Sequence, residues 1–330
     1  MRAAVVREFG PVESAAWGEM PDPVPRPNEV LIRIAATAAN FVDLLVIGGK
    51  YQFLPERPFV PGKLPAGAVA AVGAEVKDLK VGDRVLSLAE HGGYAELVAV
   101  PASQCFRLPA SMSFVEAASM ALVYDTAWFA LRDRARIQPG ETVLVLGATG
   151  GVGLAALQLA KAFGARVLAG VSSLDKSDLV RASGADEVID LSRPDLRESL
   201  RAQVHAVTGG QGADIILDPL GDDIFDAALR ALAWRGRLVV IGFAAGRIPT
   251  IKANYLLLKN IEVSGLQVSD YRKRRPEQMA ECISEVFALY EAGKVKPAPT
   301  TTLPMAEFQD ALSRIRDRKA RGRVVLTPTG

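Results

Sequence analysis

The stretch that decides the fold is "PGETVLVLGATGGVGLAALQLAKAFGARVLAGV", residues 139–171. An apolar run near its start predicts a buried strand, and the glycine-rich turn that follows opens a pattern of helical period. A second apolar run, residues 167–171, predicts another strand. Strand, helix and strand in this order make one βαβ unit, whose two strands lie parallel in a sheet.

The segments after this unit repeat the alternation of strand and helix. Further strands are predicted by "ADEVID" (185–190), "ADIILDPLG" (213–221) and "GRLVVIGF" (236–243). Helical patterns at residues 195–209 and 224–236 separate them. The fold class predicted from this order is α/β, with a doubly wound parallel sheet of the Rossmann type and helices on both of its faces.

The N-terminal third of the chain shows a different pattern. Short apolar runs, such as "NEVLIRIAATAAN" (28–40) and "YAELVAV" (94–100), are separated by Pro and Gly turns. This pattern is typical of a compact, barrel-like β domain. The segment "PDPVPRPNE" (21–29) is expected to be a surface connector, because its prolines exclude regular strand pairing.

The period becomes helical at Ser113. Residues 113–135 predict a helix, with Ser113 and Glu116 in position to form a capping box. Residues 276–293 predict another helix. Residues 308–328 predict a helix and a terminal strand that rejoins the first domain.

We therefore expect the chain to form two domains, the first of which is built from both ends. Residues 1–121 are expected to begin the β-rich domain, residues 122–265 to form the dinucleotide-binding domain, and residues 266–330 to return to the first domain. A chain of 330 residues is long enough for two domains with their own cores.

Composition excludes several function classes. The formal net charge of +2 is too small to imply nucleic-acid or membrane binding by itself. Cys105 and Cys282 are far apart in the sequence and suggest no disulfide framework, which fits a reducing compartment. No segment resembles a signal peptide or reaches a membrane-spanning length, so a soluble, cytoplasmic protein is expected.

The glycine turn predicts a dinucleotide site. Ala148, Gly150 and Gly153 occupy the A-x-G-x-x-G form of the dinucleotide fingerprint, between a strand and a helix. Gly150 and Gly151 let the backbone approach a pyrophosphate, and the helix N-terminus presents N–H groups to it. The alternative is a turn whose glycines serve tight packing only.

The end of the second strand, "VLAGVSSLDK" (167–176), indicates which dinucleotide binds. This position normally carries a carboxylate that accepts hydrogen bonds from the ribose hydroxyls, but here it carries Ser172 and Ser173. Hydroxyl groups donate to phosphate oxygens, and Lys176 adds a positive charge, so NADPH is favoured over NADH. The alternative is that Ser172 caps the next helix and Lys176 is a solvated helix residue.

Taken together, the motifs resemble the medium-chain dehydrogenase/reductase architecture along essentially the whole chain. "NFVD" (40–43), "VGDRV" (81–85), "GGYAEL" (92–97), "PGETVLVLGATGGVG" (139–153) and "GADEVID" (184–190) are similar to the zinc-independent quinone oxidoreductase (zeta-crystallin) branch. The resemblance implies a GroES-like catalytic domain joined to a Rossmann domain.

The segment "PGKLPAG" (61–67) argues against a metal site. Zinc alcohol dehydrogenases of this architecture have Gly-His-Glu where this chain has Gly62, Lys63 and Leu64. With two cysteines and two histidines in all, neither a structural Cys₄ site nor a catalytic Cys₂His site is available at the family's spacing. We expect no metal.

The resemblance also implies which residues lie near the nicotinamide. Asn40 and Asp43 match the branch's "NF.D", and Tyr51 matches the "G.Y" that follows it. Asn40 and Tyr51 are predicted to polarise the substrate, and Thr126 to orient the cofactor carboxamide. Asp125 stands where glycine is more common and is predicted to act as an acid or to disfavour anionic substrates.

The predicted cofactor-binding set comes from four segments. It consists of Thr126, Gly150, Gly151, Val152, Ser172, Ser173, Lys176, Gly242 and Phe243. Zinc-free hydride transfer suits an electron-poor acceptor, so the chemistry expected from the resemblance is NADPH-dependent reduction of a quinone. A reductase acting on the C=C bond of an enone or enoyl-CoA is the closest alternative.

Two further expectations concern partners. The segment "YRKRRP" (271–276) is expected to be a solvated loop, with CoA-phosphate binding or RNA binding by Arg272, Lys273, Arg274 and Arg275 as alternatives. An NADPH-binding protein with a structural or RNA-binding role is therefore a third possible function. "IEVSGL" (261–266) resembles the family's edge strand, which implies a homodimer.

Overall fold

A computed structural model describes residues 1–328 of the chain. These residues form two compact units, which are described separately below. Unit 1 comprises Met1–Leu122 together with the residues from Pro297 onward, and unit 2 comprises Val123–Lys296. Each unit has its own buried apolar cluster, so each has the core that a separate domain needs.

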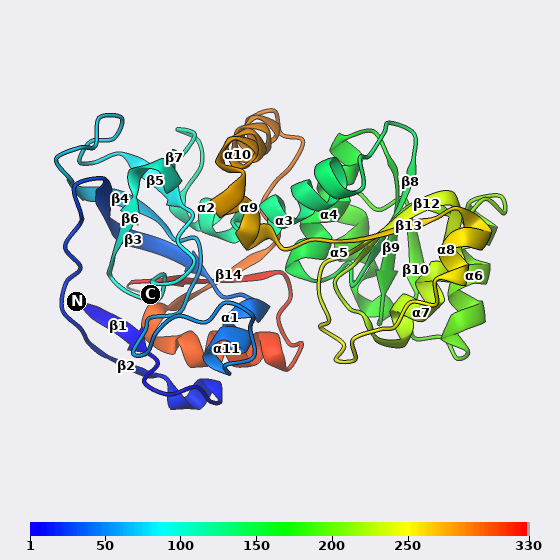
Figure 1. Cartoon of the computed structure of the whole chain (residues 1–330), viewed down its shortest axis with the longest axis horizontal. Helices are drawn as coiled ribbons and strands as arrows, with labels where there is room; N and C mark the ends of the chain where they lie inside the picture. Colours follow the sequence, from blue (N-terminus) through cyan, green and yellow to red (C-terminus); the bar gives the residue numbers. More distant parts are fainter. Residues whose placement is uncertain (329–330) are drawn as a thin grey trace. The chain divides into compact units, whose positions relative to one another are not determined.

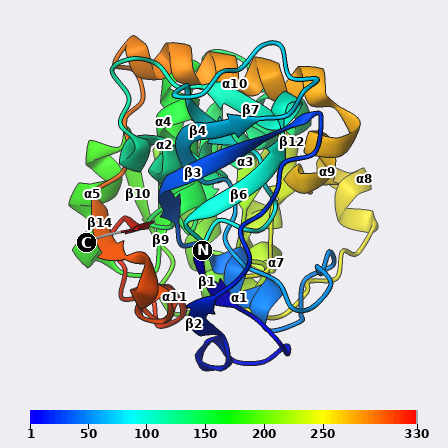
Figure 2. The same ribbon diagram turned by 90° about the vertical axis from the view of Figure 1, so that its left-hand side faces the viewer.

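Unit 1 is built on a mostly antiparallel sheet of strand order β14-β15-β3-β4-β5-β7, with β6 also paired to β3. The longest strand, β3 (Glu29–Ala38), alternates buried and more exposed residues along much of its length, as one covered sheet face requires. Figure 2 shows β3, β4 and β6 side by side. The other strands of this sheet are β4 (Ala66–Val72), β5 (Arg84–Ser87), β6 (Leu97–Pro101), β7 (Cys105–Arg107), β14 (Thr300–Pro304) and β15 (Arg323–Thr327).

The C-terminal segment returns to unit 1, as the sequence predicted. β15 pairs with β3 in antiparallel register, and α11 (Phe308–Arg316) lies against α1 (Phe41–Ile47). A separate two-stranded ribbon joins β1 (Arg2–Val5) to β2 (Ala16–Glu19).

Unit 2 is built on a six-stranded parallel sheet of order β10-β9-β8-β11-β12-β13. Figure 1 shows helices on both faces of this sheet, with α3 and α4 on one side and α6 and α7 on the other. The strands are β8 (Thr142–Leu146), β9 (Arg166–Val171), β10 (Glu187–Asp190), β11 (Ala213–Asp218), β12 (Leu232–Val240) and β13 (Glu262–Gly265). The helices are α3 (Val123–Trp128), α4 (Gly151–Ala162), α5 (Ser177–Ala182), α6 (Leu196–Val207), α7 (Asp222–Ala231), α8 (Asn254–Lys259), α9 (Val268–Arg274) and α10 (Pro276–Glu291).

The helix predicted over residues 113–135 is interrupted. It begins as expected at α2 (Phe114–Met120), where the Ser113 hydroxyl accepts from the Glu116 N–H and the Glu116 carboxylate accepts from the Ser113 N–H. It stops before Leu122, whose φ of 66° lies in the left-handed region. α3 and a π-helical turn, Phe129–Arg134, follow in unit 2.

Two other expectations about residues 224–293 differ from the structure. The strand β12 begins at Leu232, so the helix predicted over 224–236 ends five residues early, at Ala231. Residues 266–296 belong to unit 2 and not to the returning segment, because α10 packs against α3 and α9. The return therefore starts near Pro297.

No single helix within residues 1–328 has the length and apolar character needed to cross a membrane. One bent pair, Phe114–Met120 with Val123–Arg134, meets that test by length and composition alone.

Candidate active site

The predicted cofactor residues of unit 2 gather at one edge of its sheet. The glycine turn follows β8, Ser172 follows β9, and Gly242 lies just beyond β12. Because these strands are parallel, their carboxyl ends meet at the same edge. Open α/β sheets bind ligands at such an edge, at the point where the strand order reverses direction.

The glycine turn has the form that a pyrophosphate needs. Gly150 is the N-cap of α4, and the first N–H groups of a helix have no acceptor inside it. A Cβ on Gly153 would stand 2.5 Å from the Gly147 carbonyl oxygen, so only glycine lets the helix pack this close. A Cβ on Gly150 would meet protein at 3.4 Å, again the Gly147 oxygen, which leaves its other side open to a ligand. The turn therefore presents N–H groups, including those of Gly151 and Val152, to that side.

The capping role after β9 belongs to Ser173 and not to Ser172. Ser173 caps the short helical turn Leu174–Lys176, because its hydroxyl accepts from the Asp175 N–H at 3.3 Å. The expected alternative had given that role to Ser172, which is exposed. Lys176 is half-buried and makes no ion pair with any described residue. Their contact with a 2′-phosphate stays a prediction.

Asp218, at the end of β11, was missed by the sequence reasoning. Its side chain is buried, and one carboxylate oxygen accepts from the N–H groups of Leu220 and Gly221 at 2.8 and 2.9 Å. Burial raises the pKa of this carboxyl group, and its other oxygen has no protein partner. The bonds shape the turn that places Leu220 beside Gly147, so Asp218 supports the glycine turn from the neighbouring strand.

The remaining cofactor candidates lie on the same edge and on α3. Gly242 and Phe243 follow β12, and Phe243 is partly exposed. Thr126 is buried on α3, which packs against α4. The roles predicted for all three stay predictions.

Asp125 does not face open solvent, and it carries an ion pair. Its carboxylate lies 2.6 Å from the Arg272 guanidinium, with both side chains 1% exposed. The other carboxylate oxygen accepts from the Thr126 N–H at 2.6 Å. This arrangement favours a positioning role for Asp125, holding the start of α3 against α9, and the predicted acid role remains a prediction.

The same ion pair corrects the expectation for the basic segment 271–276. Residues 268–274 form the helix α9 and not a loop, and Arg272 is buried. Of the four basic residues, Arg272 neutralises the buried Asp125, whereas Lys273, Arg274 and Arg275 are exposed. The four cations therefore do not form one surface for CoA phosphates or RNA.

Of the residues predicted to lie near the nicotinamide, Asn40 and Asp43 belong to a buried hydrogen-bond network in unit 1 that is centred on Asp43. Asp43 receives hydrogen bonds from the Tyr94 hydroxyl at 2.7 Å and from the Asn40 N–H at 2.9 Å. The Asn40 side chain donates to the Ala38 carbonyl and accepts from Arg323 at 2.7 Å. The motifs "NFVD" and "GGYAEL", far apart in sequence, are thus joined through Asp43 and Tyr94.

Burial dominates the electrostatics of this network. It raises the pKa of Asp43 from 3.8 to about 6, although the Tyr94 hydrogen bond and the charges of Lys63 and Arg323 favour the ionised form. Burial and the adjacent Asp43 also raise the pKa of Tyr94 well above its usual value, so its phenol keeps its proton. Asp43 therefore changes charge close to neutral pH.

Lys63 is the second residue that the sequence reasoning did not place in the site. It is 4% exposed, and its ammonium lies 2.5 Å from the Glu90 carboxylate and 5.4 Å from the centre of the Tyr51 ring. Tyr51 itself is half-buried and packs edge-on against Phe53. The sequence singled out Lys63 only as a residue unable to bind zinc.

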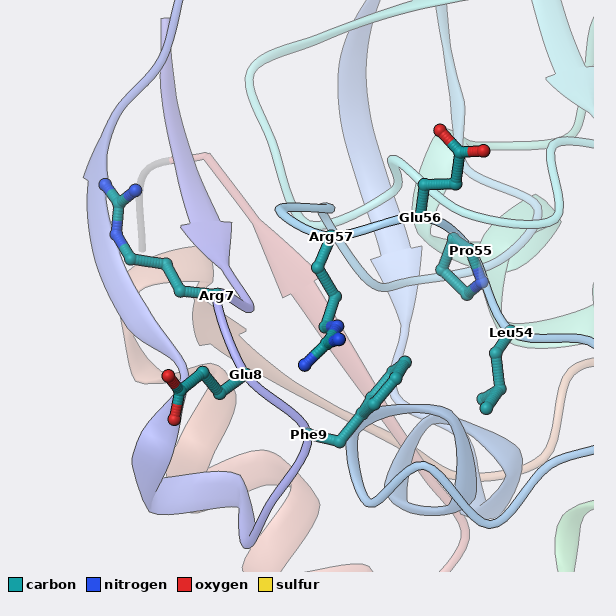
Figure 3. Close-up of a pocket in the computed structure, with 7 residues that line it drawn as sticks. All are labelled: Arg7, Glu8, Phe9, Leu54, Pro55, Glu56 and Arg57. Carbon is teal, nitrogen blue, oxygen red and sulfur yellow. The ribbon is translucent and has the colours of Figure 1, made fainter.

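A surface pocket lies elsewhere on unit 1 and contains none of these residues. Figure 3 shows its lining, with the Arg57 guanidinium turned toward the Phe9 ring at 4.7 Å from the ring centre. Most of its residues are exposed, so we do not assign the site there. Within residues 1–328, no three side chains of His, Cys, Asp or Glu gather in a way that could hold a metal ion.

Comparisons with known proteins bear on both units. Residues 26–110 match the family described as the alcohol dehydrogenase GroES-like domain, and residues 151–285 match the zinc-binding dehydrogenase family. The quinone oxidoreductase-like protein 2 homolog of Nematostella vectensis is 38% identical over 302 residues, covering 91% of this chain and 81% of the relative. The chain belongs to the medium-chain dehydrogenase/reductase family, in its quinone oxidoreductase branch.

Solved structures agree with this assignment. Escherichia coli quinone oxidoreductase, determined in complex with NADPH, superposes with a TM-score of 0.91 at 29% identity, over 99% of this chain and 100% of that one. The CurK enoyl reductase superposes with a TM-score of 0.88 at 27% identity, over 99% of this chain and 98% of that one. The family and fold predicted from the motifs are thereby confirmed, and the family is one of oxidoreductases.

Proposed function

We propose that this medium-chain dehydrogenase/reductase reduces a quinone, or a similarly electron-poor acceptor, by two electrons with NADPH. The observation that carries the proposal is the carboxyl edge of the unit 2 sheet, where an open glycine turn and a carboxylate-free strand end occur together. The relatives named quinone oxidoreductase and the relative determined with NADPH support it.

The residues of unit 2 fit NADPH. The N–H groups of Gly151 and Val152 at the start of α4 suit the pyrophosphate, because the helix dipole favours an anion there. Ser172, Ser173 and Lys176 suit a 2′-phosphate, since the exposed end of β9 offers donors and a cation and no carboxylate before Asp175. NADPH, when bound, supplies the hydride of the reduction.

The residues of unit 1 suit the other half of the reaction, which is handling the acceptor. Asn40 is fixed by three hydrogen bonds, two at its side chain and one at its backbone N–H, so it loses little freedom when a substrate arrives. One N–H of its side-chain amide remains available beyond the bond to Ala38. Tyr51 adds a phenol beside Lys63. Both are proposed to polarise the carbonyl group of the acceptor.

A reductase for conjugated C=C bonds is the second candidate, because the CurK enoyl reductase shares the fold over nearly the whole chain. An NADPH-binding protein without turnover is the third. Initial rates of NADPH oxidation with 1,4-benzoquinone, a simple enone and crotonyl-CoA distinguish them. The proposal expects the quinone to give the highest kcat/KM. Preference for crotonyl-CoA favours the second candidate, and no oxidation with any acceptor favours the third.

A homodimer remains part of the proposal. β13 is an edge strand of the unit 2 sheet, so its outer side has no strand partner within the described chain. Light scattering at several protein concentrations tests this expectation, with a mass near twice 35.1 kDa as the expected result.

A further inference from the structure

Lys63 is a buried charge for which the surrounding packing gives no reason. The ion pair of Lys63 with Glu90 contributes little net stability, because the desolvation of the buried ammonium offsets its attraction to the carboxylate. An apolar side chain of similar length would fill the same space at less cost. The position of Lys63 therefore calls for an explanation other than stability.

The hydrogen bonds of Lys63 are also incomplete. An ammonium has three N–H donors, and Glu90 is the one hydrogen-bond acceptor that the described residues offer it. Buried donors without acceptors cost about 1–3 kcal/mol each. Two donors are thus left for an oxygen atom that is not part of the folded chain.

The neighbours of Lys63 indicate which oxygen that is. The ammonium lies beside Tyr51, which is proposed to contact the acceptor, and acts electrostatically on Asp43, which is bonded to Asn40. Lys63 is thus linked to both residues proposed to handle the acceptor in unit 1, to Tyr51 directly and to Asn40 through Asp43. A carbonyl oxygen of the proposed acceptor is the oxygen that would suit the two remaining donors of Lys63.

We propose that Lys63 is the proton donor of the reduction, an inference that rests on the proposed function. When the acceptor carbon receives the hydride, a new C–H bond forms and the electron pair of the π-system moves to the carbonyl oxygen. The oxygen takes a proton from Lys63 Nζ, so that an O–H bond forms and an N–H bond breaks. NADPH is oxidised to NADP⁺, the acceptor is reduced by two electrons, and Lys63 becomes a neutral amine.

Glu90 is the residue that restores the proton. Its side chain is 25% exposed, whereas that of Lys63 is 5% exposed, so Glu90 is the member of the pair that meets water. A proton taken from water by the Glu90 carboxylate passes to the amine along the existing 2.5 Å contact. The pair then returns to its starting charges.

The test compares Lys63→Ala, Lys63→Met and Lys63→Arg with the wild type, using NADPH and 1,4-benzoquinone. Lys63→Ala is expected to lower kcat by about a hundredfold or more, the usual contribution of a general acid, with an unchanged dissociation constant for NADPH. Methylammonium is expected to restore activity to Lys63→Ala, which leaves a cavity, and not to Lys63→Met, which fills it. Lys63→Arg keeps the charge but releases no proton, so its kcat is expected to stay low.

Two controls accompany this series. Lys161→Ala breaks an ion pair with Asp186 of similar length, 2.6 Å, on the surface of unit 2, and is expected to keep the wild-type kcat. Glu90→Gln is expected to keep the rate of the first turnover, because Lys63 itself supplies the first proton, and to slow later turnovers. Circular dichroism and NADPH binding confirm that each variant is folded.

The outcomes separate the inference from the proposed function. If the wild type reduces quinone and folded Lys63→Ala keeps a kcat within threefold of it, the inference is wrong and the proposed function stands. If Lys63→Arg restores full kcat, Lys63 acts by charge alone and is not the proton donor. If the wild type reduces no acceptor, the proposed function fails and the inference fails with it.

Discussion

Two aspartates are buried to the same degree in the two units, but their environments are opposite. In unit 2, Asp125 forms a direct ion pair with Arg272 at 2.6 Å, with both side chains shielded from water. In unit 1, Asp43 has no cation within ion-pair distance in the described chain and receives hydrogen bonds from a phenol and an amide N–H. Because a guanidinium is always charged, the first arrangement is a fixed link between helices. The second holds a carboxyl group whose pKa is raised to about 6.

The difference shows what each buried charge is suited to do. The ion pair between α3 and α9 fixes the start of α3, where the Asp125 carboxylate also accepts from the Thr126 N–H. A carboxyl group that is held by neutral donors, with Lys63 and Arg323 nearby, changes its charge as the pH passes through about 6. The predictions below test this contrast, from the largest effect to the smallest.

Arg272→Met is expected to produce the largest loss of stability. It leaves the Asp125 carboxylate buried without its partner, and such broken pairs cost about 3–5 kcal/mol. Urea unfolding followed by circular dichroism measures the loss. The double variant Asp125→Leu/Arg272→Met is the control and is expected to recover most of the stability, since no charge remains to be solvated. A loss below about 1 kcal/mol for Arg272→Met would show that the pair is not truly buried.

Asp43→Asn is expected to flatten the dependence of stability on pH. The folded-state pKa of Asp43 is raised, so its protonated form is preferred by the folded protein. The stability that this group contributes is complete below its ordinary pKa of 3.8 and is lost as the pH rises through about 6. The shift of about two pKa units corresponds to about 3 kcal/mol.

The measurement is the free energy of unfolding of wild type and Asp43→Asn between pH 4 and pH 8. The difference in the free energy of unfolding between the two proteins should change by about 3 kcal/mol between pH 4 and pH 8 and be constant above pH 7. If the difference in the free energy of unfolding is independent of pH, the raised pKa of Asp43 is contradicted. The contrast between Asp43 and Asp125 then fails as well.

Tyr94→Phe is expected to have the smallest effect on stability. It removes one hydrogen bond from Asp43 and leaves the fully buried ring in place, so a cost of about 1–2 kcal/mol is expected. Because this bond favours the ionised carboxylate, its loss should raise the pKa of Asp43 further. The pH at which stability falls should therefore move upward. A downward movement would show that Tyr94 does not donate to Asp43.

The sequence predicts the parallel sheet and the glycine turn of unit 2 more directly than the side-chain network of unit 1, because the two regions are built differently. The glycine turn acts through backbone N–H groups within one continuous segment, and the residues after each strand meet because parallel strands share an edge. A strand pattern and a glycine spacing are sufficient to predict such a site. The family motifs added the positions of Asn40 and Tyr51.

The network of unit 1 depends on side chains from distant segments. These contacts form only when β3, β15 and the loop before β6 pack together, because they join Asn40, Tyr94 and Arg323. No periodic pattern in the sequence predicts such contacts. The burial of Arg272 was missed for the same reason, since four consecutive basic residues look alike in a sequence. The break at Leu122 also left no signal, because neither proline nor glycine marks it.

The proposed function requires that the carboxyl edge of unit 2 bind NADPH. The most direct test is the ratio of kcat/KM for NADPH to that for NADH, with 1,4-benzoquinone as acceptor, in wild type and in Lys176→Glu. We expect a ratio of roughly ten or more for the wild type, since one charge-assisted contact to the 2′-phosphate supplies about that factor. For Lys176→Glu we expect a ratio near one or below. Equal use of NADH and NADPH by the wild type, with no change in the variant, would contradict it.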